Sequence, residues 1–261
     1  MITLFIGDII GSPGRAVTQK LLPGLKQKYA PDLIIANGEN ATHGNGLNRA
    51  TYEELTGKME IDVLTSGNHI WDKKEIFRDL ASLTKLVRPA NYPPGTPGQE
   101  KVIVECNGEK VGIINLLGRV FMPTYDDPFR AADRLVAELQ KQGVKQIIVD
   151  IHAEATSEKA ALAWYLDGRV SAVIGTHTHV QTADERLMPQ GTAFITDAGQ
   201  TGAYNSIIGV QKAPVLKRFL TMMYESFEPE SSGPMQFNGV VIETDFRGKA
   251  KSIQRIYEVV N

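Results

Sequence analysis

The side chains of this 261-residue chain that are suited to metal or acid-base chemistry stand directly after short apolar runs. Carboxylates and amides follow the earlier runs, namely Asp8, Glu39, Asn40 and Asn68. All five histidines occupy equivalent places, namely His43, His69, His152, His177 and His179. In open α/β sheets, ligands bind outside the carboxyl ends of the strands. If the apolar runs are strands, this pattern predicts one shared polar crevice.

The mixture of imidazole, carboxylate and amide groups indicates a transition-metal site. Such a donor set suits Mn, Fe, Zn or Co, whereas a pure Mg or Ca site would use oxygen ligands only. A structural zinc site would usually need cysteine, and the single cysteine, Cys106, precedes an Asn107-Gly108 turn, where we interpret it as a strand residue. The candidate ligands are Asp8, Glu39, Asn40, Asn68, His152, His177 and His179. Seven groups exceed the needs of one ion and fit two ions ~3.5–4 Å apart that share a carboxylate.

The segment His177-Thr178-His179 is the strongest local signal and admits two geometries. In an extended segment, two histidines spaced i, i+2 face the same side. In a tight turn after a strand they can instead reach two adjacent ions. The sequence alone leaves both arrangements open.

The elements that must position these groups alternate between strand and helix. Strands are expected at 2–6, 33–36, 63–65, 101–106, 110–116, 146–151, 172–174, 193–196, 237–244 and 250–257. Helices are expected at 16–29, 49–58, 73–80, 129–142, 157–166 and 213–223, with Pro23 kinking or ending the first part of the first. Strand-helix alternation favours a layered α/β fold, and the two hairpins add antiparallel strands to one or two mixed sheets. We expect a single domain over 1–261.

Composition excludes several classes of protein. Lys and Arg total 28 against 30 Asp and Glu, a net charge of −2, so the chain is not a generic nucleic-acid binder. One cysteine excludes an internal disulfide framework. The first residues lack a basic region and soon meet Asp8, and no apolar run approaches the length of a membrane span, so we expect a cytoplasmic protein without membrane contact. No Walker A, G-x-G-x-x-G or G-x-S-x-G motif is present.

Several motifs carry a family resemblance. Gly7-Asp8, Gly67-Asn68-His69 and the Gly-Thr-His-Thr-His block at 175–179 resemble the calcineurin-like metallophosphoesterases. The ordered blocks at 7–15, 37–41, 115–122, 150–159 and 175–180 more closely resemble the bacterial YmdB-like branch, the 2′,3′-cyclic-nucleotide 2′-phosphodiesterases. Two further blocks, at 196–199 and 206–209, extend the likeness over most of the chain.

The resemblance implies a four-layer α/β sandwich, with mixed sheets flanked by helices and a two-metal site at the strand ends. By the same resemblance, Asp8, Asn40 and His179 would hold one ion. Asn68, His152 and His177 would hold the other, and Glu39 would bridge the two. His69 would act as general acid or transition-state stabiliser near the phosphate, not as a ligand.

Two positions depart from the wider superfamily and match the YmdB-like branch. The first motif is usually Asp-x-His, whereas here it is Asp8-Ile9-Ile10, and the bridging carboxylate is Glu39 in place of an aspartate. These departures affect the metal identity more than the reaction class. We expect Fe or Mn, with Zn as a further candidate.

The activity implied by the resemblance is hydrolysis of a small phosphodiester, a 2′,3′-cyclic nucleotide, to the 3′-nucleotide by a water activated by two metal ions. One alternative is a metallophosphatase or phosphodiesterase of broader specificity. Another is a metal-bound regulatory, RNA-associated protein with weak catalysis. A third, a metal-dependent amidohydrolase barrel, would favour His-x-His on the first strand, not a late one. The sequence leaves open a homo-oligomer and the roles of His43, Phe121 and Asp197.

Overall fold

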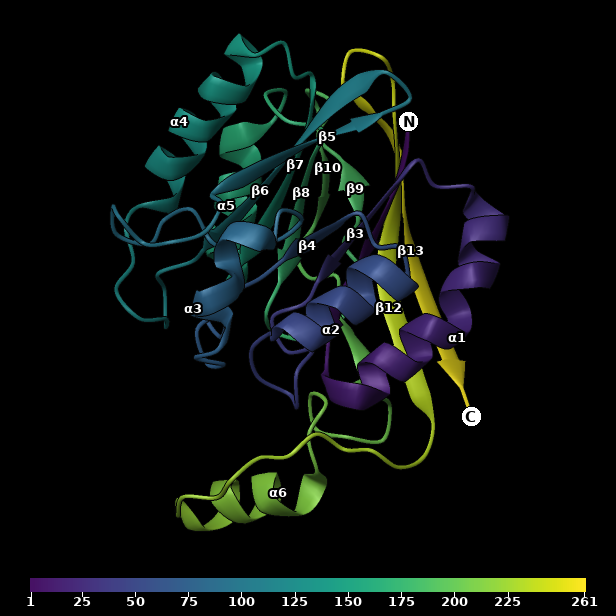
Figure 1. The fold of residues 1–261 in the computed structure, drawn as a ribbon, viewed down its shortest axis with the longest axis vertical. Helices are drawn as coiled ribbons and strands as arrows, with labels where there is room; N and C mark the ends of the chain where they lie inside the picture. The colour runs from purple at the N-terminus through teal and green to yellow at the C-terminus, as the bar shows by residue number, and fades with distance from the viewer.

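The computed structural model describes residues 1–261 and contains two mixed β-sheets packed against each other between helices (Figure 1). The first sheet has the order β2-β11-β12-β1-β3-β4, with β13 paired to β12. Its strands are β1 (Ile2–Ile6), β2 (Asp8–Ile9), β3 (Leu33–Asn37), β4 (Val63–Thr65), β11 (Gln200–Ala203), β12 (Met235–Thr244) and β13 (Ala250–Val260). β1 runs parallel to β3 and antiparallel to β12.

The second sheet has a parallel centre and antiparallel edges. Its order is β5-β6-β7-β8-β10-β9, with the inner neighbours β6 to β10 parallel to one another. Its strands are β5 (Lys101–Cys106), β6 (Glu109–Leu117), β7 (Gln146–His152), β8 (Ala172–Thr176), β9 (Arg186–Leu187) and β10 (Ala193–Ile195). The expected hairpin around Asn107-Gly108 joins β5 to β6.

Helices cover the outer face of each sheet. α1 (Gly11–Tyr29) and α2 (Arg49–Glu53), which continues into a π-helical turn at Glu54–Lys58, lie on the first sheet. α4 (Pro128–Lys141) and α5 (Thr156–Leu166) lie on the second. The remaining helical segments are α3 (Ile76–Asp79), a 3-10 turn at Leu80–Ser82, and α6 (Lys212–Thr221).

Alternation along the strands divides the apolar residues among three cores. In β1, Leu4 packs with the helices outside the first sheet, while Phe5 packs between the two sheets. In β7, Val149 packs with α4 and α5, while Ile148 faces the space between the sheets. Successive side chains of a strand point to opposite faces, so both sheets are covered on each side. Three cores separate four layers, and the predicted four-layer α/β sandwich is confirmed.

The structure corrects some local expectations. α1 begins at Gly11 and continues through the exposed Pro23, so Pro23 does not end it. The helix expected at 73–80 shortens to α3 and its 3-10 turn, because Ile76 is the only residue of those two segments that is buried. β2, β9 and β11 were not expected, since strands of two to four residues are too short to show periodicity. None of the helices has the length and apolar character needed to cross a membrane.

Adding a Cβ at two glycines, Gly24 in α1 and Gly239 in β12, should change the stability of the protein in opposite directions. A Cβ on Gly24, inside α1, would meet no atom within 4 Å. A helical glycine costs ~0.5–1 kcal/mol relative to alanine, so Gly24→Ala should raise the free energy of unfolding by about that amount in urea denaturation. In β12, a Cβ on Gly239 would overlap the carbonyl oxygen of Phe5, so Gly239→Ala should lower stability by ~1–3 kcal/mol. A lower midpoint for Gly24→Ala would contradict this reading of α1.

Candidate metal centre

The two sheets together bring the seven predicted ligand residues to one place. The first sheet supplies Asp8 at the start of β2, Glu39 and Asn40 after β3, and Asn68 after β4. The second supplies His152 at the end of β7, with His177 and His179 after β8. Strand order places the carboxyl ends of β3, β4, β7 and β8 at the same end of the sandwich. The centre is therefore built across both sheets.

One group of donors surrounds the ring of His152. The ligand atoms of Glu39, His152 and His177 all lie within 4.8 Å of one another. His152 Nε2 is 3.0 Å from Glu39 Oε1 and 3.0 Å from His177 Nδ1. Asn68 Oδ1 lies 3.1 Å from the same nitrogen. Four donors thus point at one small volume.

A second group adjoins the first and shares Glu39 with it. The ligand atoms of Asp8, Glu39 and His179 also lie within 4.8 Å of one another. Asn40 Nδ2 is 3.2 Å from His179 Nε2 and 3.1 Å from Glu39 Oε1. Glu39 is therefore the one carboxylate common to two adjacent donor groups.

The residues of the centre fit bound cations. Asp8 is fully buried, and its Oδ1 has no hydrogen-bond partner. Burial raises the pKa of Asp8 to about 6, although His179 and His152 act in the opposite direction. A buried carboxylate oxygen without a partner is costly, and a cation would remove that cost. A Cβ on Gly67 would overlap Glu39 Oε2 and lie 2.5 Å from His152 Nε2, so only glycine leaves this space open.

Comparison with known proteins identifies the family. The model of the YmdB-like protein family matches residues 4–256, nearly the whole chain. The chain belongs to the YmdB-like family. The chain is 52% identical over 254 residues to the 2′,3′-cyclic-nucleotide 2′-phosphodiesterase of Bacillus subtilis, with 97% of this chain and 95% of that protein covered.

Solved structures agree with the family assignment. The YmdB-like chain superimposes on a Thermus thermophilus protein with a TM-score of 0.92 at 44% identity, covering 99% of both chains. It superimposes on a Mycoplasma pneumoniae protein described as a novel phosphatase with a TM-score of 0.91 at 38% identity, covering 99% of this chain and 93% of the other.

In this YmdB-like centre, the outer nitrogen of each of the three histidines is held by an acceptor. His152 Nδ1 is 2.9 Å from Thr176 Oγ1. The Thr176 hydroxyl in turn donates a hydrogen bond of 2.7 Å to Asp150 Oδ1. His177 Nε2 is 3.2 Å from Glu154 Oε2, and His179 Nδ1 is 3.0 Å from the carbonyl oxygen of Ile208. Each ring is thereby oriented with its other nitrogen toward the centre. Metal-binding histidines usually have such a partner on the ring nitrogen that faces away from the metal.

The electrostatics of the rings agree with this arrangement. Burial, helped by the charge of His152, lowers the pKa of His177 to about 3, so its ring is neutral near pH 7. Burial opposes a charge on His152, but the charge and hydrogen bond of Glu39 outweigh it and raise the pKa of His152 to about 9. The Glu39 carboxylate thus favours a positive charge at His152 Nε2. A metal ion would supply that charge in place of the proton.

The structure decides between the two geometries left open for the His-x-His segment. His177 and His179 have positive φ values of 97° and 65°, so the segment is a tight turn and not extended. Their rings consequently enter the two different donor groups. Positive φ is unfavourable for histidine, so the turn needs support from its surroundings.

That support comes from a buried ion pair between Lys159 and Asp197. The sequence alone did not indicate that these two residues interact. Lys159 Nζ of α5 lies 2.7 Å from Asp197 Oδ2, and both side chains are fully buried. The same oxygen of Asp197 accepts hydrogen bonds from the backbone nitrogen of Thr178 at 3.1 Å and from its hydroxyl at 2.7 Å. Asp197, whose role the sequence left open, therefore holds the residue between the two histidines.

His69 stands apart from both donor groups. Its backbone nitrogen donates to Glu39 Oε2 at 3.2 Å, while its ring Nδ1 lies 2.8 Å from Asp72 Oδ2. Sequence reasoning missed Asp72, although its spacing of three residues from His69 within a turn is the signal that identifies it. His43 is exposed and belongs to neither donor group, and Phe121 is 89% exposed.

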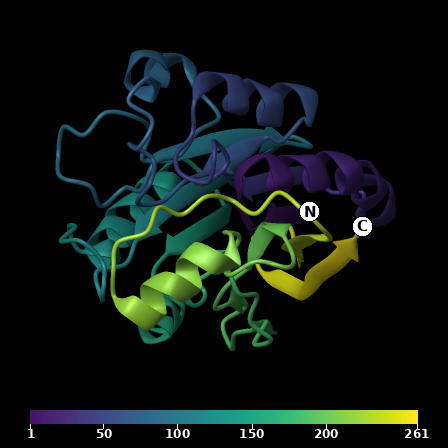
Figure 2. The same ribbon diagram turned by 90° about the horizontal axis from the view of Figure 1, so that it is seen from below.

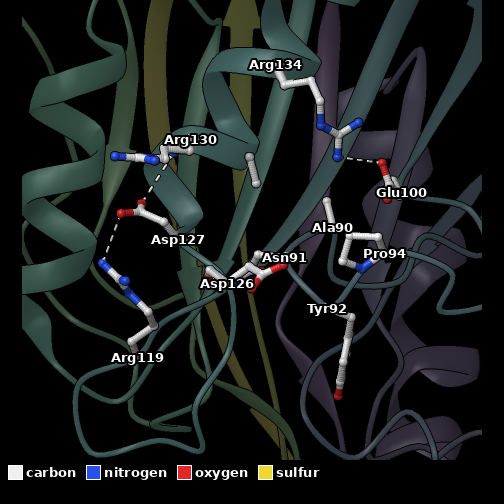
Figure 3. Close-up of a pocket in the computed structure, with 11 residues that line it drawn as sticks. Ala90, Asn91, Tyr92, Pro94, Glu100, Arg119, Asp126, Asp127, Arg130 and Arg134 are labelled. Atoms are coloured by element: carbon white, nitrogen blue, oxygen red, sulfur yellow. Dashed lines mark hydrogen bonds and ion pairs between the residues drawn. The ribbon is translucent and has the colours of Figure 1, made fainter.

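A cavity lies beside the first half of α4. It has a volume of about 800 Å³, and Figure 3 shows Tyr92, Asn91 and Arg119 among the residues that line it. Two of its three arginines form ion pairs, with Arg119 3.2 Å from Asp127 and Arg134 2.7 Å from Glu100. Burial raises the pKa of Tyr92, and the negative charge of Glu39 adds to this effect.

The buried ion pair generates a test of how the turn is held. Lys159→Met should lower the free energy of unfolding by ~3–5 kcal/mol, because it leaves Asp197 charged and buried without its partner. The double variant Lys159→Met with Asp197→Asn should recover part of that loss. Chemical denaturation of both variants provides the measurement. A Lys159→Met protein as stable as the wild type would show that the pair does not support the turn.

Proposed function

We propose that this YmdB-like protein is a metal-dependent phosphodiesterase that hydrolyses 2′,3′-cyclic nucleotides to 3′-nucleotides. The general class, a phosphoesterase, follows from the family and from the 52% identity to a 2′,3′-cyclic-nucleotide 2′-phosphodiesterase. The observation that supports a two-metal mechanism is that Glu39 belongs to both adjacent donor groups.

In this proposal, the two donor groups correspond to two metal ions. Asp8, Asn40 and His179 would hold one, and Asn68, His152 and His177 would hold the other, with Glu39 shared by both. Nitrogen and oxygen donors together suit Fe or Mn, and also Zn. Such a pair of ions, when bound, would neutralise the phosphate oxygens and lower the pKa of the attacking water.

The chain's own residues set the geometry in which this chemistry occurs. Asp150 and Thr176 fix the tautomer of His152 through a chain of hydrogen bonds. Lys159 and Asp197 hold the tight turn that separates His177 from His179. These groups are buried, so the positions of the ligands are preorganised before substrate arrives.

His69 is the proton donor in this mechanism. Opening the cyclic phosphate at the 2′ oxygen releases an alkoxide, which is a poor leaving group unless it is protonated. The Asp72 carboxylate, 2.8 Å from His69 Nδ1, fixes the orientation of the ring. The ring is one-third exposed, and an incoming phosphodiester can approach it.

The name of the relative that is 52% identical supports a substrate of nucleotide size. A second candidate function is a phosphatase or phosphodiesterase of broader specificity, which the description of the M. pneumoniae relative as a phosphatase favours. A substrate panel of 2′,3′-cyclic nucleotides against phosphomonoesters and bis-p-nitrophenyl phosphate distinguishes the two.

The bridging role of Glu39 makes a prediction about metal content. Elemental analysis of metal-replete wild type should give two ions per chain. Glu39→Gln should give one or fewer and should lose more activity than Asp8→Asn or His177→Ala, since it weakens both sites at once. Glu105→Gln, a neutralised glutamate exposed on β5, is the matched control and should keep both ions. Full turnover with two ions in Glu39→Gln, or a single ion in the wild type, would contradict the bridge.

The separate position of His69 makes a different prediction. His69→Ala should keep its metals and lose ~10²–10⁴-fold in rate on a cyclic nucleotide, the usual contribution of a positioned proton donor. The loss should shrink on a p-nitrophenyl ester, whose leaving group needs no proton. His152→Ala, the comparison variant, should lose metal together with activity. If His69→Ala also lost metal in step with activity, His69 would be a ligand and the division of roles would be wrong.

A further inference from the structure

A helical arm, residues 209–230, projects from the sandwich (Figures 1 and 2). Its base is closed by hydrogen bonds from the Gln211 nitrogen to the Glu228 oxygen and from the Glu230 nitrogen to the Gly209 oxygen, each 3.0 Å long. Between them lie α6 and the segment that returns along it. Figure 2, seen from below, shows α6 in front of the rest of the chain.

The apolar side of the arm faces solvent instead of the body of the protein. Val215 is the only buried residue of α6. Leu216, Phe219 and Leu220 are 52%, 77% and 83% exposed, and Met223 is 62% exposed. The spacing of Leu216, Phe219 and Leu220, at i, i+3 and i+4, puts them along one side of α6, the pattern that surface helices normally turn toward a core, and Met223 follows just past the helix end. This stripe has no core within its own chain.

The arm keeps a defined structure despite this exposure. Lys217 Nζ lies 2.5 Å from Glu225 Oε1, and the Arg218 guanidinium lies 5.2 Å from the centre of the Phe227 ring. The backbone nitrogen of Met222, a residue with positive φ, bonds to the Arg218 oxygen at 2.8 Å and ends the helix. These contacts tie the returning segment to α6. The apolar side chains are thereby presented outward on a fixed support.

The exposed area matches what a stable protein interface needs. Met222 and Tyr224, 87% and 86% exposed, stand on either side of Met223 just past the end of α6. Together these six residues expose ~800 Å², which is about the area that each partner contributes to a standard protein–protein interface. A monomer rarely exposes an apolar patch larger than a few hundred Å².

The charge of the arm indicates the nature of its partner. Residues 209–230 contain three basic and three acidic side chains, so their net charge is zero; they are Lys212, Lys217, Arg218, Glu225, Glu228 and Glu230. A helix that binds an anionic membrane surface would carry an excess of basic residues on its polar face. A neutral arm meets no repulsion from an identical arm.

We propose that the arm is a homodimer interface, in which the α6 stripes of two copies of this chain pack against each other across a two-fold axis. Such an interface uses the same patch on both copies, so one self-complementary apolar stripe is sufficient. The proposal does not depend on the proposed function.

Sedimentation velocity over a concentration series tests the interface. The metal-loaded wild type should be a dimer at ~10 µM, since interfaces of this area bind with micromolar or better affinity. Phe219→Asp with Leu220→Asp should raise the dissociation constant ~100-fold or more, because two central apolar side chains are lost. Phe246→Asp, which replaces an aromatic residue 64% exposed in the turn between β12 and β13, is the matched control and should remain dimeric.

Two outcomes would overturn the proposal: a wild type that stays monomeric at ~100 µM, well above the expected dissociation constant, or an aspartate double variant that dimerises as the wild type does. A monomeric wild type that floats with vesicles of phosphatidylcholine and phosphatidylglycerol would assign the arm to a lipid surface. If circular dichroism shows that the aspartate pair disturbs folding, Leu216→Ser with Leu220→Ser asks the same question with a smaller change.

Discussion

The buried carboxylate of Glu39 is the interaction on which the rest of the centre depends. It touches His152, Asn40 and the backbone of His69, and these three come from different parts of the chain. The charge and hydrogen bond of His152 outweigh burial and lower the pKa of Glu39 to about 2. A negative charge is thus kept on a side chain that is almost fully buried. Such a charge needs positive partners, and the surrounding side chains are arranged to hold them.

The layered fold explains why these partners can gather there. Each sheet presents its polar ligand groups at the same end of the sandwich, beyond the apolar residues that pack between the two sheets. The first sheet contributes mainly oxygen donors and the second contributes imidazole nitrogens. Neither sheet alone provides both kinds of ligand. The space between them stays open because Gly67 has no side chain to fill it.

Most of the fold and the members of the donor groups could be predicted from the sequence, because both follow from local patterns. Short apolar runs marked strands such as 2–6, and polar residues after those strands marked Asp8 and His152. The supporting contacts could not be predicted, because they join residues far apart in sequence. Lys159 and Asp197 are separated by 38 positions, and the contact of Asp150 with Thr176 by 26. The outward stripe of α6 was also hidden, since a helical period does not tell which neighbour the apolar side meets.

The division of the ligands between two sheets has a consequence for folding. Each donor group draws residues from both sheets, so a cation held by either group would act as a cross-link between them. A ligand that binds only the folded state adds RT ln(1 + [L]/Kd) to its stability, which is about 4 kcal/mol at a thousandfold excess over Kd. The melting temperature of this protein would then depend on the free metal concentration around it. A chelator would do more than stop turnover: it would loosen the sandwich from the end where the two sheets meet.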